Sequence, residues 1–205
     1  MGDWTRRDFF SGAALFALAI GVPAGAVQLS GLDADEAPTD RQRKLMREVS
    51  QLVIPRTSTA GAGDVGVGDF VLIALAHGLA GTRKPVPEAV GGQHRRKDGS
   101  LRHVAWLEQA LDQRAGGNFL GHPPAKRAAI LAALDAEAFP AGPPAKEPAP
   151  WSSIKGLILT GYYTSEVGGS QELQYELVPG RFDPDVPVTP ATRAFSSDWT
   201  AVEFG

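Results

Sequence analysis

The chain has 205 residues, a net charge of −3 at pH 7 and no cysteine. Without cysteine there is no disulfide, no iron–sulfur cluster, no thiolate zinc site and no covalent haem of the C-x-x-C-H type. The small negative charge and the even spread of charged residues give no electrostatic case for binding nucleic acid or an anionic membrane surface. Glycine and proline make up about a fifth of the chain, which predicts long ordered loops between short helices.

The N-terminus predicts an export signal. Arg6 and Arg7 are followed by Phe9 and by a short apolar run over residues 13–22. This pattern resembles the twin-arginine signal, which directs proteins across a membrane after they have folded. The run is too short and too weakly apolar to remain in a bilayer as a spanning helix. The alternative is a soluble amphipathic first helix, but such a helix would not continue from paired arginines into an unbroken apolar face.

The signal divides the chain into three parts. Small residues before position 27 predict cleavage after Ala26, so residues 1–26 are the signal. Polar and small residues over 27–38 indicate a linker, and 39–205 is long enough for one domain with its own core. The expected location is therefore the periplasm.

Hydrophobic periodicity predicts a mainly α domain with five helices. Thr39 or Asp40 caps the first helix, which Pro55 ends, and Pro124 is typical of the first turn of the fourth. The predicted helices are 40–54, 70–81, 101–111, a segment beginning at 124, and 151–163. Beyond residue 163, alternation is weak, which predicts only short strands and an extended C-terminal segment that wraps a partner.

The residues with catalytic potential do not form a recognisable site. The four histidines lack metal-ligand spacing, and His77 is interpreted as a half-buried structural residue. His94 and His103 flank a basic run at 95–97, which is interpreted as a solvated turn or, alternatively, as a docking patch for an acidic partner. The G-x-G-x-x-G string at 61–66 follows a predicted helix rather than a strand, so we interpret it as a flexible loop and not as a dinucleotide site. Glu166 lies among aromatic residues and is predicted to be half-buried.

Two sequence blocks stand out from this background. The first is LVIPRTSTAGAGDVGV over residues 52–67, running into Asp69 and Phe70. The second is LTGYYTSEVG over residues 159–168, continuing to VPGRFD at 178–183. With the paired arginines they resemble the gluconate 2-dehydrogenase subunit 3 family, over most of the chain from about residue 41 to the C-terminus.

This resemblance implies a division of labour within a complex. Such chains are non-flavin small subunits that supply the export signal to the twin-arginine translocase and help the large subunit to mature. The large subunit would be a flavoprotein of the glucose–methanol–choline type that holds FAD, and a multihaem cytochrome c is a frequent third subunit. Association with such a complex would also connect the chain to a membrane. The family often carries a cysteine after the Pro-Gly-Arg-aromatic-Asp stretch, but this chain has Pro184 and Asp185 there, so association must be noncovalent.

The second block predicts a partner interface, because tyrosine combines a large apolar area with a polar tip. An equally weighted alternative places Tyr162 and Tyr163 in this chain's own core. The predicted interface residues are Tyr162, Tyr163, Thr164, Ser165, Glu166, Tyr175, Arg181, Phe182 and Trp199. No catalytic, cofactor-binding or metal-binding residue is assigned to the chain itself.

Two rival functions remain open. One is a stand-alone periplasmic enzyme that uses Glu166 or a histidine as a base. The other is an export chaperone that leaves its client after translocation.

Overall fold

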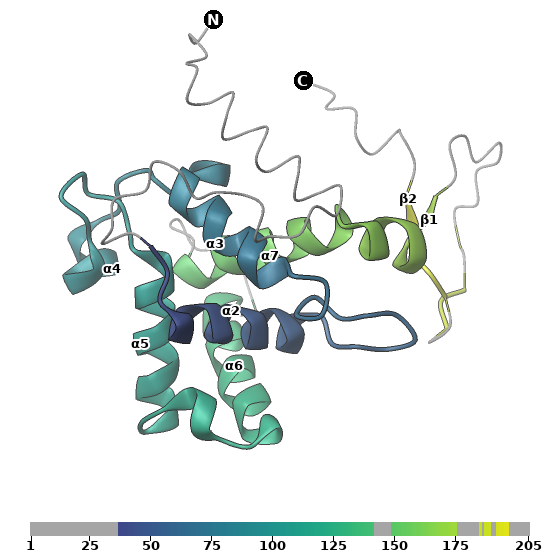
Figure 1. Ribbon diagram of the computed structural model, residues 1–205, viewed down its shortest axis with the longest axis horizontal. Coiled ribbons are helices and arrows are strands. Elements are labelled where there is room, and N and C mark those ends of the chain that lie inside the picture. The colour runs from purple at the N-terminus through teal and green to yellow at the C-terminus, as the bar shows by residue number, and fades with distance from the viewer. Residues whose placement is uncertain (1–36, 142–148, 176–184, 186, 190–191, 197–205) are drawn as a thin grey trace, which may run out of the picture.

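The computed structural model describes residues 37–141, 149–175, 185, 187–189 and 192–196 (Figure 1). It confirms a mainly helical fold. The α-helices are α2 (Asp40–Val53), α3 (Val67–His77), α4 (Glu88–Gly91), α5 (His103–Ala115), α6 (Pro124–Ala138) and α7 (Pro150–Tyr163). Single turns form η2 (Leu79–Gly81), η3 (Gly92–His94), η4 (Phe119–Gly121) and the π-type turn η5 (Gly168–Glu172). The predicted signal with Arg6, Arg7 and Phe9, and the predicted interface residues Arg181, Phe182 and Trp199, lie outside the described residues.

The first helix begins where its sequence predicts. The Thr39 side chain accepts a hydrogen bond from the Gln42 backbone N–H at 3.2 Å, and Gln42 Oε1 accepts one from the Thr39 backbone N–H at 3.1 Å. This reciprocal pair satisfies two donors that a helix N-terminus otherwise leaves open. Ile54 is the C-cap and Pro55 follows it, so the helix also ends as predicted.

The second and third predicted helices form with shifted boundaries. α3 starts at Val67, three residues before the predicted Phe70, and ends at His77 because Gly78 adopts a left-handed conformation with φ of 80°. The remaining residues to Gly81 form the separate turn η2. α5 starts at His103 instead of 101 and continues to Ala115, where Gly116 ends it with φ of 69°. α6 and α7 begin at prolines, which suit the first helical turn.

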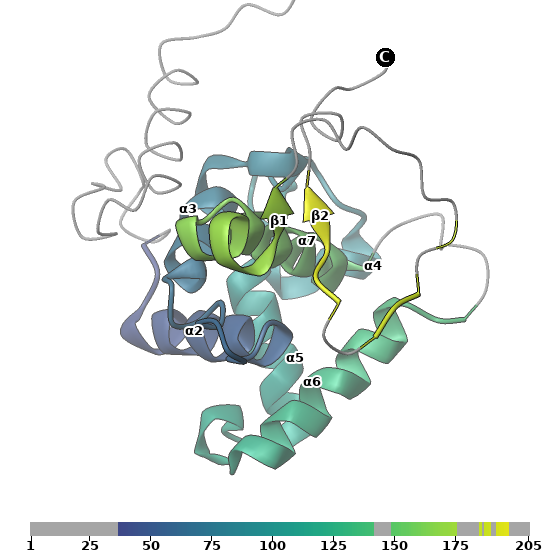
Figure 2. The ribbon, with the colours of Figure 1, turned by 90° about the vertical axis from the view of Figure 1, so that its right-hand side faces the viewer.

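The core lies where the long helices pack together. Figure 1 shows α2 and α7 running across the molecule while α5 and α6 descend below them, and Figure 2 shows the same arrangement from the side. Ion pairs join the two horizontal helices to the two below them. Arg41 of α2 pairs with Glu108 and Asp112 of α5, and Lys155 of α7 lies 2.7 Å from Asp135 of α6. The largest fully buried side chains are Trp151, Tyr162, Phe119, Leu45, Met46, Leu101, Leu107 and Leu111.

Residues 82–102, named here the basic lobe, project at the left of Figure 1. The sequence predicts a loop here, and the structure adds the short helix α4 and two isolated antiparallel bridges, Pro85 with Ser100 and Arg95 with Leu101. Asp98 closes the turn by accepting hydrogen bonds from the Ser100 N–H at 2.9 Å and its hydroxyl at 2.7 Å. These hydrogen bonds hold the pKa of the Asp98 carboxyl below its usual value.

Two strands of two residues each follow the helices. β1 (Gln174–Tyr175) and β2 (Phe195–Ser196) pair in parallel, with Gln174 opposite Phe195. Within the described ranges, no helix is both long and apolar enough to cross a membrane.

Candidate partner interface

The two sequence blocks, far apart in the chain, meet at one end of the molecule. The Tyr162 hydroxyl donates a hydrogen bond to the Ala60 carbonyl oxygen at 2.9 Å, across 102 positions. The Thr59 hydroxyl donates to Glu172 Oε2 at 2.5 Å and joins the same loop to η5. Both contacts lie where α7 ends and the α2–α3 loop turns back, at the right of Figure 1. The blocks therefore form one structural unit.

A second contact between the blocks depends on a glycine. The Phe70 ring of α3 lies against Gly161 of α7, and a Cβ built at Gly161 would be 2.5 Å from Phe70 Cδ1. Only a residue without a side chain allows the two helices to approach this closely. Gly161 is therefore required for packing α7 on α3, and it fixes which residues of α7 face outward.

The G-x-G-x-x-G string packs closely against α2, which corrects its interpretation as a flexible loop. Residues 61–63 are buried. A Cβ at Gly61 would lie 2.6 Å from the Gln51 side chain, and one at Gly63 would lie 2.6 Å from the Arg47 carbonyl oxygen. Glycine is needed at both positions because the loop backbone lies so close to α2 that a side chain would not fit. The Asp64 carboxylate accepts a hydrogen bond from the Gly61 N–H at 3.0 Å and keeps the loop closed.

Both blocks also contain exposed residues. We refer to these exposed residues together as the motif surface: Pro55, Arg56, Thr57, Ser58, Asp64, Gly66, Leu159, Thr160, Tyr163, Thr164 and Glu166. Leu159 is 39% exposed and Tyr163 is 41% exposed, and they lie one helical turn apart. Its three charged residues are Arg56 and Asp64, which pair with each other at 3.0 Å, and Glu166. Exposed aromatic and aliphatic residues with few charges are typical of the centre of a protein–protein interface.

The predicted interface residues divide between the surface and the core. Tyr162 is 1% exposed, so its assignment to a partner surface was wrong, and it belongs to this chain's own core. Tyr163 meets it edge to face with ring centroids 5.3 Å apart and is accessible. Tyr175 is in β1. Position along α7 separates the two tyrosines, because Tyr162 continues the buried stripe of Ile154 and Ile158.

The polar residues after Tyr163 build the end of α7. The Thr164 hydroxyl donates to the Thr160 carbonyl oxygen at 2.7 Å, and the Ser165 hydroxyl donates to that of Tyr162 at 2.6 Å. Ser165 Oγ also accepts from the Gly168 N–H at 3.1 Å, which starts η5. Glu166 is exposed, contrary to its predicted half-burial.

Leu159 and Thr160 contribute to the outward face of α7 but are not among the predicted interface residues. Their spacing of four and three residues from Tyr163 indicates a shared face, because residues three or four apart lie on one side of a helix. Gly156 precedes them with open space around it and no atom within 4 Å of a built Cβ.

The histidines have different hydrogen-bond partners in the structure. His77 is half-buried, as predicted. His94 contacts Gln109, and His122 Nε2 lies 3.1 Å from the Ala115 carbonyl oxygen. In the part of the chain that the structure describes, no group of three or more His, Asp or Glu residues is placed to hold a metal ion.

His103 is buried, unlike the other three histidines. It is 6% exposed, and its Nδ1 lies 3.0 Å from the Leu101 carbonyl oxygen. Burial, together with the nearby positive charge of Arg96, lowers the pKa of His103 to about 4. The ring is therefore neutral near pH 7 and acts as a packed structural group under the basic lobe.

These observations define a helical protein whose two characteristic sequence blocks pack together at one end of the domain. The chain belongs to the gluconate 2-dehydrogenase subunit 3 family, whose model matches residues 40–180. The match contains the first block and most of the second. A member of this family is a subunit of a dehydrogenase complex. No curated protein and no solved structure matches the chain.

Proposed function

We propose that this chain is the non-catalytic small subunit of a periplasmic sugar or glycoside dehydrogenase complex, in which it exports and stabilises a flavoprotein. The large subunit is of the glucose–methanol–choline type, holds FAD and carries the catalytic base. The twin-arginine translocase recognises Arg6, Arg7 and Phe9 of this chain, and the folded flavoprotein crosses with it. A multihaem cytochrome c with haem c serves as a third subunit and links the complex to the membrane.

The motif surface is the observation that supports this proposal most directly. It joins both family blocks, it exposes Leu159 and Tyr163, and its charges are few. A noncovalent partner fits this surface because apolar contact, and not a disulfide, must hold the complex together in a chain without cysteine. Two such anchors contribute ~2 kcal/mol or more each to a protein interface.

Co-expression tests the proposal. The flavoprotein is produced alone, with this chain, and with an Arg6→Lys/Arg7→Lys variant, and each sample is assayed for FAD content, sugar oxidation with an artificial acceptor, and location. We expect soluble, FAD-loaded and exported enzyme only with the unaltered chain. The double-lysine variant should leave an assembled complex in the cytoplasm. An active and exported flavoprotein in the absence of this chain would refute the proposal.

The same preparations distinguish the two rival functions. A stand-alone enzyme predicts turnover by the purified chain and its loss in Glu166→Gln. The exposed position of Glu166 favours the accessory role, because catalytic sites exclude water from the reacting groups. An export chaperone predicts that the exported flavoprotein is recovered free of this chain, whereas a subunit co-purifies with it in a fixed ratio.

A further inference from the structure

Helix α2 carries two cations without a partner in the described part of the chain. Residues 40–53 contain four basic and two acidic side chains, a net charge of +2; since the whole chain carries −3, the rest carries −5, and the prediction of evenly spread charge was wrong. Arg41 and Arg43 form ion pairs with α5 and α3. Lys44 and Arg47 are exposed, and no hydrogen bond or ion pair joins either side chain to another described residue. Two uncompensated positive charges therefore lie about one helical turn apart.

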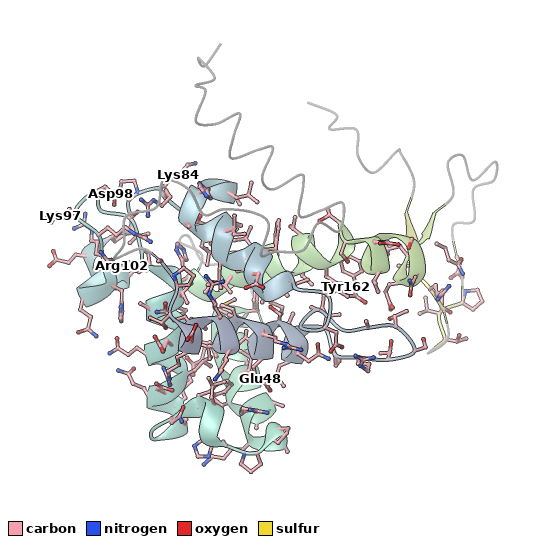
Figure 3. All side chains as sticks on the ribbon, in the orientation of Figure 1. Glu48, Lys84, Lys97, Asp98, Arg102 and Tyr162 are labelled. Carbon is pink, nitrogen blue, oxygen red and sulfur yellow. The ribbon has the colours of Figure 1, made fainter. Side chains whose placement is uncertain are left out.

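The same two side chains line a polar cavity between α2 and α6, named here the α2 cavity. Its volume is about 450 Å³, and its sides include Glu48 and Gln51 of α2 and Arg127 of α6. The α2 residues share one face of the helix because they are three, four and seven positions apart. In Figure 3, Glu48 lies below α2 and is well separated from Lys84 and Lys97 of the basic lobe.

Both carboxylates that line the α2 cavity are already paired with arginines. Arg127 Nη2 lies 3.0 Å from Glu48 Oε1, and Arg56 Nη2 lies 3.0 Å from Asp64 Oδ2. Asp64 also accepts a hydrogen bond from Gln51 Nε2 at 3.2 Å. Each ion pair is neutral as a unit, so the electrostatic field in the cavity comes mainly from the two unpaired cations of α2. The cavity therefore favours negatively charged groups.

The composition and position of the α2 cavity favour a protein segment over a small molecule. Small-molecule sites are lined mostly by apolar side chains, whereas five of the eight residues that line this cavity are charged. Asp64 belongs both to the cavity and to the motif surface, so a protein bound at the motif surface reaches the cavity as well. An apolar centre with a polar and charged rim is the usual anatomy of a protein interface.

The basic lobe is a second positively charged region, with a net charge of +4 over residues 82–102. Its residues Arg83, Arg96 and Arg102 already interact with other groups. Arg96 also donates a hydrogen bond to the Leu101 carbonyl oxygen within the lobe. These arginines therefore contribute to the structure of the lobe itself, whereas the two unpaired cations of α2 are available to a partner.

We propose that the α2 cavity receives acidic side chains of the flavoprotein. This inference rests on the proposed function, in which the flavoprotein covers the motif surface. Aspartate or glutamate suits the cavity because the planar guanidinium of Arg47 matches a carboxylate with two parallel hydrogen bonds, and Lys44 adds a flexible ammonium group. Exposed charge pairs add little affinity, but they accelerate encounter and fix orientation. The motif surface then holds the complex, and the α2 cavity determines how the flavoprotein is oriented as it associates.

Association kinetics with the flavoprotein test this proposal. Lys44→Glu/Arg47→Glu reverses both charges of the α2 cavity, and Lys84→Glu/Lys97→Glu makes two matched reversals at exposed positions of the basic lobe. We expect the α2 variant to lower the association rate constant at low salt on the order of tenfold and to flatten its dependence on salt. The lobe variant should keep the association rate of the unaltered chain. The dissociation rate should change less than the association rate, because apolar contact holds the complex.

The outcomes separate this inference from the proposed function. A complex that forms equally fast with the α2 variant and with the unaltered chain would overturn the inference alone, and so would an equal loss in both variants. Absence of any complex with the unaltered chain would refute the proposed function, and the inference with it. Lys44→Gln/Arg47→Gln removes the charges without adding repulsion and should slow association less than the reversal does. Thermal unfolding of each variant checks that its fold is intact.

A zero-length crosslink identifies the occupant. A carbodiimide joins a lysine amine to a carboxylate in direct contact, so we expect Lys44 to link to an aspartate or glutamate of the flavoprotein in the assembled complex. A link from Lys84 or Lys97 in its place would move the acidic contact to the basic lobe, and a link from Lys44 to a second copy of this chain would indicate self-association. Saturable binding of inorganic phosphate that the α2 reversal abolishes, with unchanged association of the flavoprotein, would assign the cavity to a small anion. Each of these three results would overturn the proposal.

Discussion

At one end of the molecule the motif surface exposes tyrosine, leucine and threonine, and at the other end the basic lobe exposes arginine and lysine. The two ends are also built differently. The motif surface rests on contacts between segments 102 positions apart, such as Tyr162 with Ala60. The basic lobe is held by local bonds, such as that from the Arg96 N–H to the Ser100 carbonyl oxygen at 2.7 Å.

This difference indicates two kinds of binding. Apolar contact resists salt and its strength grows with buried area, whereas contact between exposed charges is weak and is screened by salt. We therefore expect the motif surface to determine whether the complex stays assembled. A contact at the basic lobe should be the more salt-sensitive of the two.

The largest expected effect is on assembly. Leu159→Glu/Tyr163→Glu places two charges on the motif surface, and loss of two anchors of ~2 kcal/mol each predicts a roughly thousandfold weaker affinity for the flavoprotein. Co-purification and titration measure this loss. Phe139→Glu/Val188→Glu makes the same chemical change at exposed apolar residues outside the surface and should leave assembly intact. Assembly that survives the first variant would place the interface elsewhere.

The next effect concerns the residue beneath the basic lobe. Because the pKa of His103 is about 4 in the folded state and 6.5 as its ordinary value, protons bind the unfolded chain first as the pH falls. The stability that the neutral ring contributes is complete above about pH 6.5 and is lost between there and pH 4, by roughly 3 kcal/mol. Denaturant unfolding between pH 4 and pH 6.5 measures how the unfolding free energy changes with pH. His103→Gln should flatten this dependence, while His122→Gln should not.

A pair of glycines on α7 tests the close approach beneath the motif surface. Gly161→Ala forces a Cβ into the Phe70 ring and should destabilise the fold by about 1–3 kcal/mol. Gly156→Ala meets open space and should stabilise it by ~0.5–1 kcal/mol, because alanine favours the helix. Thermal unfolding compares the two. Equal effects would show that α7 does not pack on α3 as described.

The smallest effect separates the adjacent tyrosines. Tyr162→Phe removes the hydrogen bond to the Ala60 carbonyl oxygen and should cost ~1 kcal/mol of unfolding free energy. Tyr163→Phe removes an exposed hydroxyl and should change stability by less than ~0.5 kcal/mol. A larger loss of unfolding free energy in Tyr163→Phe than in Tyr162→Phe would show that Tyr163, and not Tyr162, belongs to the core.

Local sequence signals determined the helices and their ends. Thr39 with Gln42, Pro55 after α2, and Pro124 at the start of α6 act on their own backbone neighbourhood, so their consequences can be predicted from sequence. The family blocks were also recognisable, because they are continuous in the chain. The start of α3 was misplaced by three residues because Val67 and Gly68 are buried by packing, which no local signal in the glycine-rich loop indicates.

Only the tertiary structure decided which residues face outward and which segments meet. Tyr162 and Tyr163 have the same side chain, and the approach of Phe70 to Gly161 orients α7 so that one is buried and the other exposed. Glycine is required at positions 61 and 63 because the loop backbone there lies directly against α2, which folds from a different part of the sequence. Such contacts join residues far apart in sequence, and their geometry depends on packing of the whole domain.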